Sequence, residues 1–348
     1  MSSLPRPQEV AARSVRVRRE AIAPLFGLRV ALVIGVLMTV WLAAGMPYAA
    51  IWFALGAQFA AMTDPGGQIG YRLRNMAVGS VVAGLSVCVG SLIASSMLAQ
   101  VIVVPVWGVV AALGTVFGMG RGKIGIVAAF SLLGASASQV HGIQPLLLAL
   151  AVIGGGALQL VAAAAWPASN PDHGHPGPAP PGWAEVRAKI GWHTPIARHA
   201  IRMALGLAIG VVIYDTAELT YGVWVGVTTL LILRPSLVDS ADRTFMRLVG
   251  TLIAVVVVTG LAGIAGLSLV TVVLLVMLSE GISFAFVRAQ YGIQAGALGA
   301  AMVVLFALTG TPETELAGAR ILDTVIGGLI AAAVTLLIRE PGPDPAVG

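Results

Sequence analysis

The stretch from Tyr221 to Thr251, YGVWVGVTTLLILRPSLVDSADRTFMRLVGT, decides the fold of this chain. A short apolar segment ends at Arg234-Pro235, and a polar connection of about ten residues follows before a second apolar segment begins at Arg247. Apolar runs interrupted by Pro and charged residues are typical of two helices joined by a loop. The stretch therefore predicts a helical hairpin whose charged elbow lies at one face of a membrane.

The same hairpin occurs once before in the chain. At a shift of 173 residues Arg29 corresponds to Arg202 and Tyr48 to Tyr221, and the shift changes by only a few residues elsewhere. The earlier copy contains, in the same order, Tyr48, Trp52, Asp64-Pro65, Arg72, Arg74 and Gly79-Ser80. This internal repeat predicts that the chain holds two copies of one helical unit.

The composition places the chain in a membrane. Of its 348 residues 58% are hydrophobic and only 10% are charged, whereas about a quarter of the residues of a soluble domain are charged. The 43 glycines are typical of helices that pack closely in lipid through small residues. The basic pI near 9.9 is attributed to membrane topology and not to nucleic-acid binding.

The apolar runs predict an all-α, polytopic protein with about 12 transmembrane helices in two parallel six-helix repeats. The first repeat, residues 27–166, has helices near 27–44, 48–62, 75–95, 101–118, 124–140 and 146–165. The second, residues 198–339, has helices near 199–214, 220–233, 247–265, 268–286, 292–309 and 321–338. A tail at 1–26, a Pro/Gly-rich linker at 167–197 and a tail at 340–348 are assigned to the cytoplasm.

The positions of the basic residues predict the orientation. With twelve spans and a cytoplasmic N-terminus, 19 of the 20 Lys and Arg residues fall on the cytoplasmic side, and only Arg320 falls outside. Both termini are then cytoplasmic. A secretory signal in residues 1–44 is the alternative reading of the N-terminus, but its counterpart in the middle of the chain argues against it.

No signature of a soluble enzyme is present. The sequence has no Walker A motif, no GxGxxG after a strand, no HExxH and no GxSxG. Cys88 is the single cysteine, and His173 and His175 in the linker are interpreted as part of a solvated connector and not as a metal site. We therefore expect no enzyme activity, no cofactor and no metal, and secondary transport or a channel becomes the default.

The short second and eighth helices point to a substrate site. Short or Pro-interrupted spans at matching positions of two repeats are the best indication of where a transporter binds its substrate. If the aromatic faces of the two helices meet, they form a cavity, although Tyr and Trp at helix starts also serve as interfacial anchors. The candidate substrate-binding residues are Tyr48, Trp52, Gln58, Tyr221, Trp224, Thr228 and Arg234, with Thr63 and Thr229 as further hydrogen-bonding groups.

Charged residues inside the apolar runs form a second group of candidates. A charge within a membrane is costly and therefore suggests a function. Glu280 is the deepest, and it is expected either to carry a proton or to pair with Arg247 or Arg288; Asp64 is the other candidate proton carrier. Arg320 and Asp323 lie three residues apart at the expected start of the last helix and are expected to pair with each other. The arginines at the cytoplasmic mouths would attract an anionic substrate.

The residues of the second half resemble a known family. YGVWVGVTTLLILRPS, RLVGT, FVRAQYG and RILDTVIGG are similar to the segments of the fusaric acid resistance and aromatic acid exporter family of inner-membrane proteins. The matching positions are Tyr221, Trp224, Thr228, Pro235, Arg247, Gly250, Thr251, Arg320, Asp323, Thr324 and Gly327. The first half departs from the pattern, since Asn75-Met76 replaces the Arg of RxxGT and no Arg-x-x-Asp precedes Gly154.

The resemblance implies an exporter of aromatic or other organic acids that is driven by the proton gradient. Similar six-helix units in plant malate channels pair around an anion pathway, so the two halves look like a fused dimer. A passive anion channel and a non-transporting membrane scaffold are the alternatives. The expected partners are the lipid bilayer and a small organic anion, with no nucleic acid, and the sequence leaves open whether the protein forms a homo-oligomer.

Overall fold

The chain folds entirely into helices in the part that the structure describes. The computed structural model describes residues 17–138, 140, 142–170, 181–191, 194–219, 221–234, 237–266, 268–310 and 312–338, and no strand occurs among them. The linker histidines His173 and His175, the tail at 340–348, and Arg339 lie outside the described residues. The all-helical fold class predicted from the sequence is confirmed.

Each half of the chain contains a series of helices. The first half consists of α2 (Pro24–Ala43), α3 (Pro47–Met62), α4 (Ile69–Ile93), α5 (Met97–Gly114), α6 (Met119–Ser136) and α7 (Gln144–Ala165). The second half consists of α9 (Pro195–Thr216), α10 (Val223–Ile232), α11 (Leu237–Ala265), α12 (Leu269–Ala285), α13 (Tyr291–Ala307) and α14 (Glu313–Leu337). Between them lies α8 (Trp183–Lys189), and short 3-10 turns occupy η1 (Arg19–Ala21), η2 (Thr115–Phe117) and η3 (Pro167–Ser169).

Helix starts follow local sequence signals. Proline occupies the first turn of α2, α3 and α9, where its missing N–H costs nothing because that donor has no partner within the helix. The side chains of Ser96, Thr194 and Ser268 accept hydrogen bonds from backbone N–H groups three residues on, at the starts of α5, α9 and α12. These signals fix most helix ends close to the predicted positions.

Several helices begin earlier than expected, and the difference is largest for α11 and α14. Helix α11 begins at Leu237 and not at Arg247, so the polar connection of about ten residues is mostly helical. Helix α14 begins at Glu313, which places Arg320 and Asp323 in its interior. The polar residues at these starts are tolerated because Asp239 and Glu315 point outward, while the Ser240 side chain accepts from the backbone N–H of Arg234 at 3.0 Å.

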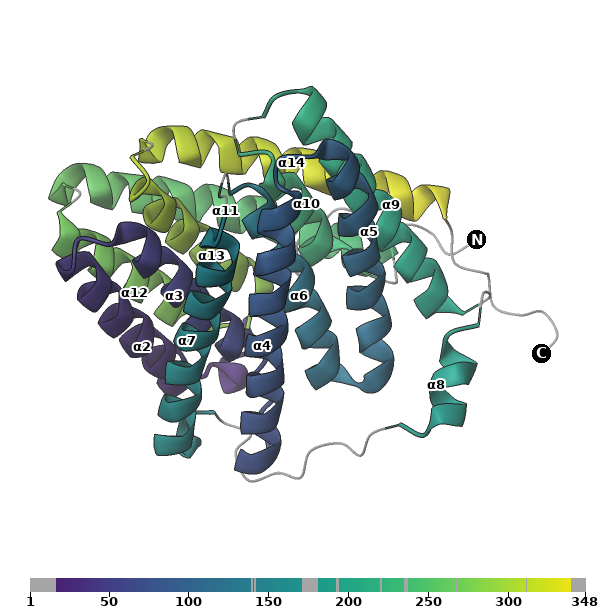
Figure 1. Ribbon diagram of the computed structural model, residues 1–348, viewed down its shortest axis with the longest axis horizontal. Helices are drawn as coiled ribbons and strands as arrows, with labels where there is room; N and C mark the ends of the chain where they lie inside the picture. The colour runs from purple at the N-terminus through teal and green to yellow at the C-terminus, as the bar shows by residue number, and fades with distance from the viewer. Residues whose placement is uncertain are drawn as a thin grey trace.

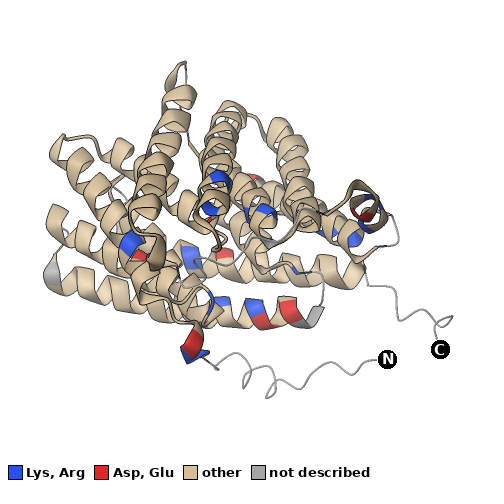
Figure 2. Ribbon diagram, turned by 90° about the horizontal axis from the view of Figure 1, so that it is seen from below, with Lys and Arg blue, Asp and Glu red and all other residues tan. Residues whose placement is uncertain are grey.

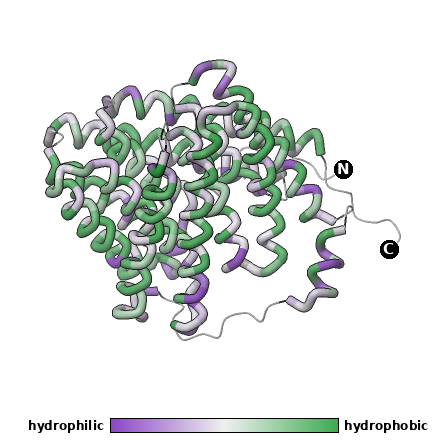
Figure 3. The backbone as a smooth tube through the Cα atoms, in the orientation of Figure 1, coloured by the Kyte–Doolittle hydropathy of each residue, from purple (hydrophilic) through white to green (hydrophobic). Residues whose placement is uncertain are grey.

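The outer surface of the molecule is apolar. Seven of the described helices are long and apolar enough to cross a membrane, and α10, α12 and α13 are shorter apolar helices. Exposed Leu, Val and Ile residues form stripes along them, for example Leu25, Leu28, Leu32, Val36 and Val40 on α2. Figure 3 shows that hydrophobic residues predominate along the long helices. Apolar surface of this extent is suited to contact with lipid, and the chain is a membrane protein.

The two halves contact each other in a reciprocal way. Helix α5 of the first half packs along α9, and α2 of the first half packs along α12. A further contact joins α6 to α10. In Figure 1 the helices α4, α5, α6 and α7 run side by side, and α11 and α14 run across them. The fourth helix of each half thus packs on the first helix of the other, as expected of two related units.

Candidate functional site

A row of aromatic side chains crosses the boundary between the two halves. Phe59 on α3 contacts Phe130 on α6 with ring centroids 5.5 Å apart, and Phe130 contacts Trp224 on α10 at 6.0 Å. Trp224 in turn contacts Phe306 on α13 at 5.9 Å. All three pairs are edge-to-face, a favoured geometry for aromatic rings. The row links α3 to α10 through α6.

Trp224 also contacts a buried cation. The guanidinium carbon of Arg320 lies 4.0 Å from the centre of the Trp224 ring, well within the range of a cation–π interaction. Trp224 is 5% exposed and Arg320 is 4% exposed. Both line a pocket of about 10 Å³, roughly the room that one water needs, together with Tyr221, Met302, Val303, Phe306 and Leu316.

The expected meeting of the α3 and α10 faces is not seen among the described residues. Trp52 and Gln58 on α3 and Thr228 on α10 are all buried. The two helices do not pack along each other, because Phe130 of α6 lies between Phe59 and Trp224. Tyr48 is 61% exposed at the start of α3, the position of an interfacial anchor.

Arg320 and Asp323 do not form the expected ion pair in the described part of the chain. Asp323 attracts Arg320 electrostatically, but no hydrogen bond or salt bridge joins them, and Oδ2 of Asp323 has no partner there. The side chain of Arg320 reaches over Trp224 instead. The prediction was wrong because it placed both residues in an exposed first turn, whereas both are buried inside α14.

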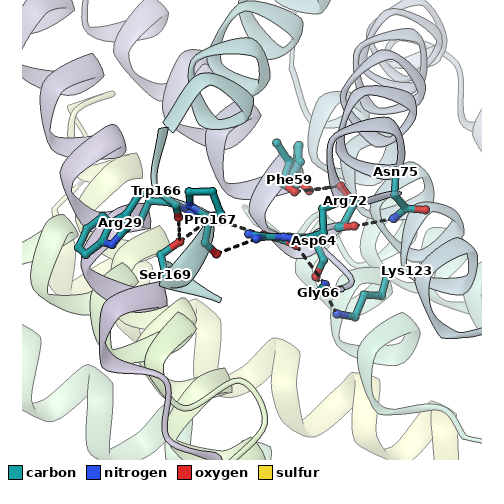
Figure 4. A network of polar contacts seen from close by, with 12 residues as sticks. Arg29, Phe59, Asp64, Gly66, Arg72, Asn75, Lys123, Trp166, Pro167 and Ser169 are labelled. Carbon is teal, nitrogen blue, oxygen red and sulfur yellow. Dashed lines mark hydrogen bonds and ion pairs between the residues drawn. The ribbon is translucent and has the colours of Figure 1, made fainter. Parts of the chain in front are cut away.

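Asp64 is the centre of a buried network in the first half, shown in Figure 4. Its Oδ2 accepts hydrogen bonds from Nη2 of Arg29 at 2.9 Å and from Nη2 of Arg72 at 2.8 Å. Its Oδ1 accepts from Nε of Arg72 at 2.9 Å and from the backbone N–H of Gly66 at 3.1 Å. We call Asp64, Arg29, Arg72 and Gly66 the Asp64 network.

The Asp64 network ties several segments together. Arg72 donates to the backbone carbonyl of Pro167 at 2.8 Å, and Arg29 donates to the Ser169 hydroxyl at 3.0 Å, so both reach the segment after α7. Lys123 on α6 donates to the Asp64 backbone carbonyl at 3.4 Å. The network therefore joins α2, α4, α6 and the segment after α7 at the end of α3.

The charge state of Asp64 follows from these contacts. Burial alone would raise the pKa of its carboxyl, but the hydrogen bonds and charges of Arg72 and Arg29 lower this pKa to about 2. Asp64 is therefore ionised at any physiological pH. Of the two proton carriers suggested by the sequence, Asp64 is the less suitable.

Basic residues outnumber acids around this network. Arg288, in the segment between α12 and α13, interacts electrostatically with Asp64 and Arg72. Lys123 interacts electrostatically with Arg288 and Asp64. Arg234, in the segment after α10, lies near Arg243 and Asp239. Figure 2 shows that most of the helical ribbon carries no charged residue. A surplus of positive charge attracts anions.

Glu280 on α12 is the other buried acid among the sequence-derived candidates. Its side chain is fully buried, and neither carboxylate oxygen has a hydrogen-bond partner in the described part of the chain. No ion pair with Arg247 or Arg288 is present among the described residues. An ionised carboxylate in such surroundings would be very costly, so the geometry favours a carboxyl that takes up a proton.

No metal site emerges from the described residues, since no group of three or more His, Cys, Asp or Glu side chains lies together there.

The aromatic partners Phe130 and Phe306 were not identified from the sequence. Both lie in apolar runs without a distinguishing signal, and only the packing of α6 and α13 against α10 reveals them.

Comparison with known proteins confirms the family resemblance for the second half. Residues 198–334 match a family described as fusaric acid resistance protein-like. An inner membrane protein of Escherichia coli, YccS, is 29% identical over 181 residues, which is 51% of this chain and 25% of YccS. An uncharacterized protein of Synechocystis is 29% identical over 152 residues, which is 43% of this chain and 20% of that protein.

An uncharacterized protein of Neisseria gonorrhoeae is 26% identical over 157 residues, which is 44% of this chain and 37% of that protein. The chain thus spans between a fifth and about two fifths of the length of these relatives. No solved structure matches the chain. The comparisons therefore show a similarity to the fusaric acid resistance family over the second half of the chain.

Proposed function

We propose, from the match of residues 198–334 to the fusaric acid resistance family, that this protein is a secondary transporter. It exports small organic anions that carry an aromatic group across the bacterial inner membrane. The observation that carries this proposal is the buried Arg320 guanidinium over the Trp224 ring at a pocket. A buried cation next to an aromatic ring matches the charge and the ring of an aromatic carboxylate, and the pocket, which holds about one water, has to widen when the carboxylate binds.

The proposed topology has twelve crossings in two parallel six-helix repeats, residues 27–166 and 198–339, with both termini in the cytoplasm. The reciprocal packing of α5 on α9 and of α2 on α12 supports the duplication. The basic residues near the Asp64 network and Arg234 would then lie at the cytoplasmic opening, where they raise the local concentration of the anion. The first repeat would contribute the other candidate substrate-binding residues, Tyr48, Trp52 and Gln58.

The role of Trp224 can be tested by substitution. Replacing Trp224 by Ala is expected to reduce export about tenfold, because losing a buried cation–π contact and its apolar surface weakens substrate binding by roughly 1–2 kcal/mol. Trp224→Phe keeps the ring and should keep most of the activity. The measurement is uptake of a radiolabelled benzoate series into inverted membrane vesicles.

The matched control is Trp183→Ala, since Trp183 on α8 is 73% exposed and lies outside the row of aromatic side chains. Unchanged uptake in Trp224→Ala, and also in Trp52→Ala, would contradict the proposed site. It would favour a membrane scaffold that transports nothing.

Proton coupling is proposed to use Glu280. Gln has the size of Glu but cannot exchange a proton, so Glu280→Gln should abolish the acceleration of export by an imposed pH gradient. The measurement is benzoate flux in proteoliposomes with and without a pH step, at clamped membrane potential. In the unmodified protein, the flux could instead be independent of the pH step and follow only the electrochemical gradient of the anion. That result would identify a passive channel.

A further inference from the structure

A second buried arginine lies near Arg320. Arg247 on α11 is 2% exposed, and its charge acts on Arg320 of α14. Arg247 also interacts with the Tyr291 hydroxyl at the start of α13, and Nη2 of Arg320 approaches Gly299 on α13. The two cations are therefore held between α11, α13 and α14, where they repel each other.

The donors of these arginines are incompletely used. Nε and Nη1 of both Arg247 and Arg320 are buried without a hydrogen-bond partner in the described part of the chain. The hydroxyls of Thr228 on α10 and Thr251 on α11 are buried and unpartnered there as well. Buried donors without acceptors are costly, and these two interacting arginines together have four such nitrogens.

The helices around these groups are packed closely. A Cβ on Gly250 of α11 would lie 2.1 Å from the Gly292 carbonyl oxygen of α13, and one on Gly327 of α14 would lie 2.8 Å from the Thr228 Cβ of α10. Substituting either glycine would therefore require the backbones to move apart. The unpartnered donors therefore lie between closely packed helices.

We propose that Arg247 and Arg320 together bind the carboxylate of one organic monoanion, whose aromatic part rests against Trp224. Each guanidinium has buried, unpartnered nitrogens that can donate to a carboxylate oxygen, and the unpartnered hydroxyls of Thr228 and Thr251 are further donors. The site holds the positive charges of Arg247 and Arg320, which repel each other, and a bound monoanion offsets this repulsion. The inference rests on the proposed function and adds the residues that hold the charged group.

Only the second half has this site. The repeat places Leu147 and Leu150 at the positions of Arg320 and Asp323, and Met76 at the position of Arg247. None of these three side chains can bind an anion, and Leu147 and Leu150 are more than half exposed on α7. Arg29 and Arg72 of the first half are already bound to Asp64. The chain should therefore bind one anion and not two.

The test is equilibrium binding of benzoate to the purified full-length protein in nanodiscs. The unmodified protein should bind one benzoate per chain, and Arg247→Met and Arg320→Met should each raise the Kd at least tenfold. Asp323→Asn removes the carboxyl that competes with the anion for Arg320, so it should lower the Kd several-fold, a change that damage to the fold would not produce. Arg187→Met, at an exposed position of α8, is the control and should leave the Kd unchanged.

Several results would overturn the inference: two benzoates per chain, an unchanged Kd in Arg247→Met, or a weaker Kd in Asp323→Asn. If a methionine variant fails to fold, the melting temperature of the unmodified protein provides the test. Benzoate should raise this temperature, and uncharged benzamide should not. Binding that follows these expectations without any flux would contradict the transport proposal and leave the site intact. Flux that survives both methionine variants would contradict the site alone.

Discussion

Replacing Asp64 by asparagine is expected to lower the free energy of unfolding by about 3–5 kcal/mol, the usual cost of removing one partner from a buried ion pair. The variant leaves Arg29 and Arg72 buried without their counter-charge, and both are at most 2% exposed. Thermal unfolding in detergent measures the effect. The melting temperature should fall by on the order of 10 °C.

The contribution of Asp64 should not depend on pH in the physiological range. Its pKa is lowered to about 2 in the folded protein, against roughly 3.9 in an unfolded chain. A lowered pKa stabilises the fold above the unfolded value, and this stabilisation is lost as the pH falls through the folded value. The difference between the protein and Asp64→Asn should therefore be constant from about pH 5 to pH 8.

The matched control is Glu185→Gln. Glu185 pairs with Lys189 on α8, but both side chains are about half exposed, and pairs of this kind contribute at most about 1 kcal/mol. The triple variant Asp64→Leu, Arg29→Met and Arg72→Met should recover much of the loss, because it removes the buried charges together. An Asp64→Asn protein that melts like the control would show that the network contributes little to stability.

The positions of the helices were largely predictable because apolar runs, prolines and capping residues are local signals. Pro47 opens α3, and Ser268 caps α12, close to the expected starts. The starts of α11 and α14 were missed for the opposite reason. The first turns of both helices contain charged residues, and a charge such as Asp239 can be in a loop or on the outer face of a helix.

The candidate site was only partly predictable. Trp224 stood out as an aromatic residue on a short span, and it does line the pocket with Arg320. The ring neighbours Phe130 and Phe306 come from helices far apart in sequence, so no spacing rule connects them. Arg320 was expected in the external first turn of the last helix, and its burial depends on how α14 packs against α10 and α11.

Replacing Gly155 by alanine is the second change with a large expected effect. A Cβ on Gly155 of α7 would lie 1.9 Å from the Phe53 carbonyl oxygen of α3, and one on Gly56 of α3 would lie 2.1 Å from the Val152 carbonyl oxygen of α7. Both obstacles are backbone atoms, which cannot turn aside as a side chain can. The two helices would have to separate, at a cost of about 1–3 kcal/mol or more.

Gly134→Ala provides the control for helix propensity, because a Cβ on Gly134 of α6 meets nothing within 4 Å. The substitution should be neutral or stabilise the protein by up to about 1 kcal/mol, since alanine has a higher helix propensity than glycine. Equal melting temperatures for Gly155→Ala and Gly134→Ala would show that the α3–α7 contact can relax freely.

The corresponding contact of the second half allows a finer test of the same argument. A Cβ on Gly327 of α14 would lie 2.8 Å from the Val225 carbonyl oxygen of α10, a milder clash than the one at Gly155. Gly327→Ala should therefore lower the melting temperature less than Gly155→Ala does. Because α10 carries Trp224 and α14 carries Arg320, it should nevertheless weaken benzoate uptake more, since a small separation of these helices moves the guanidinium away from the ring.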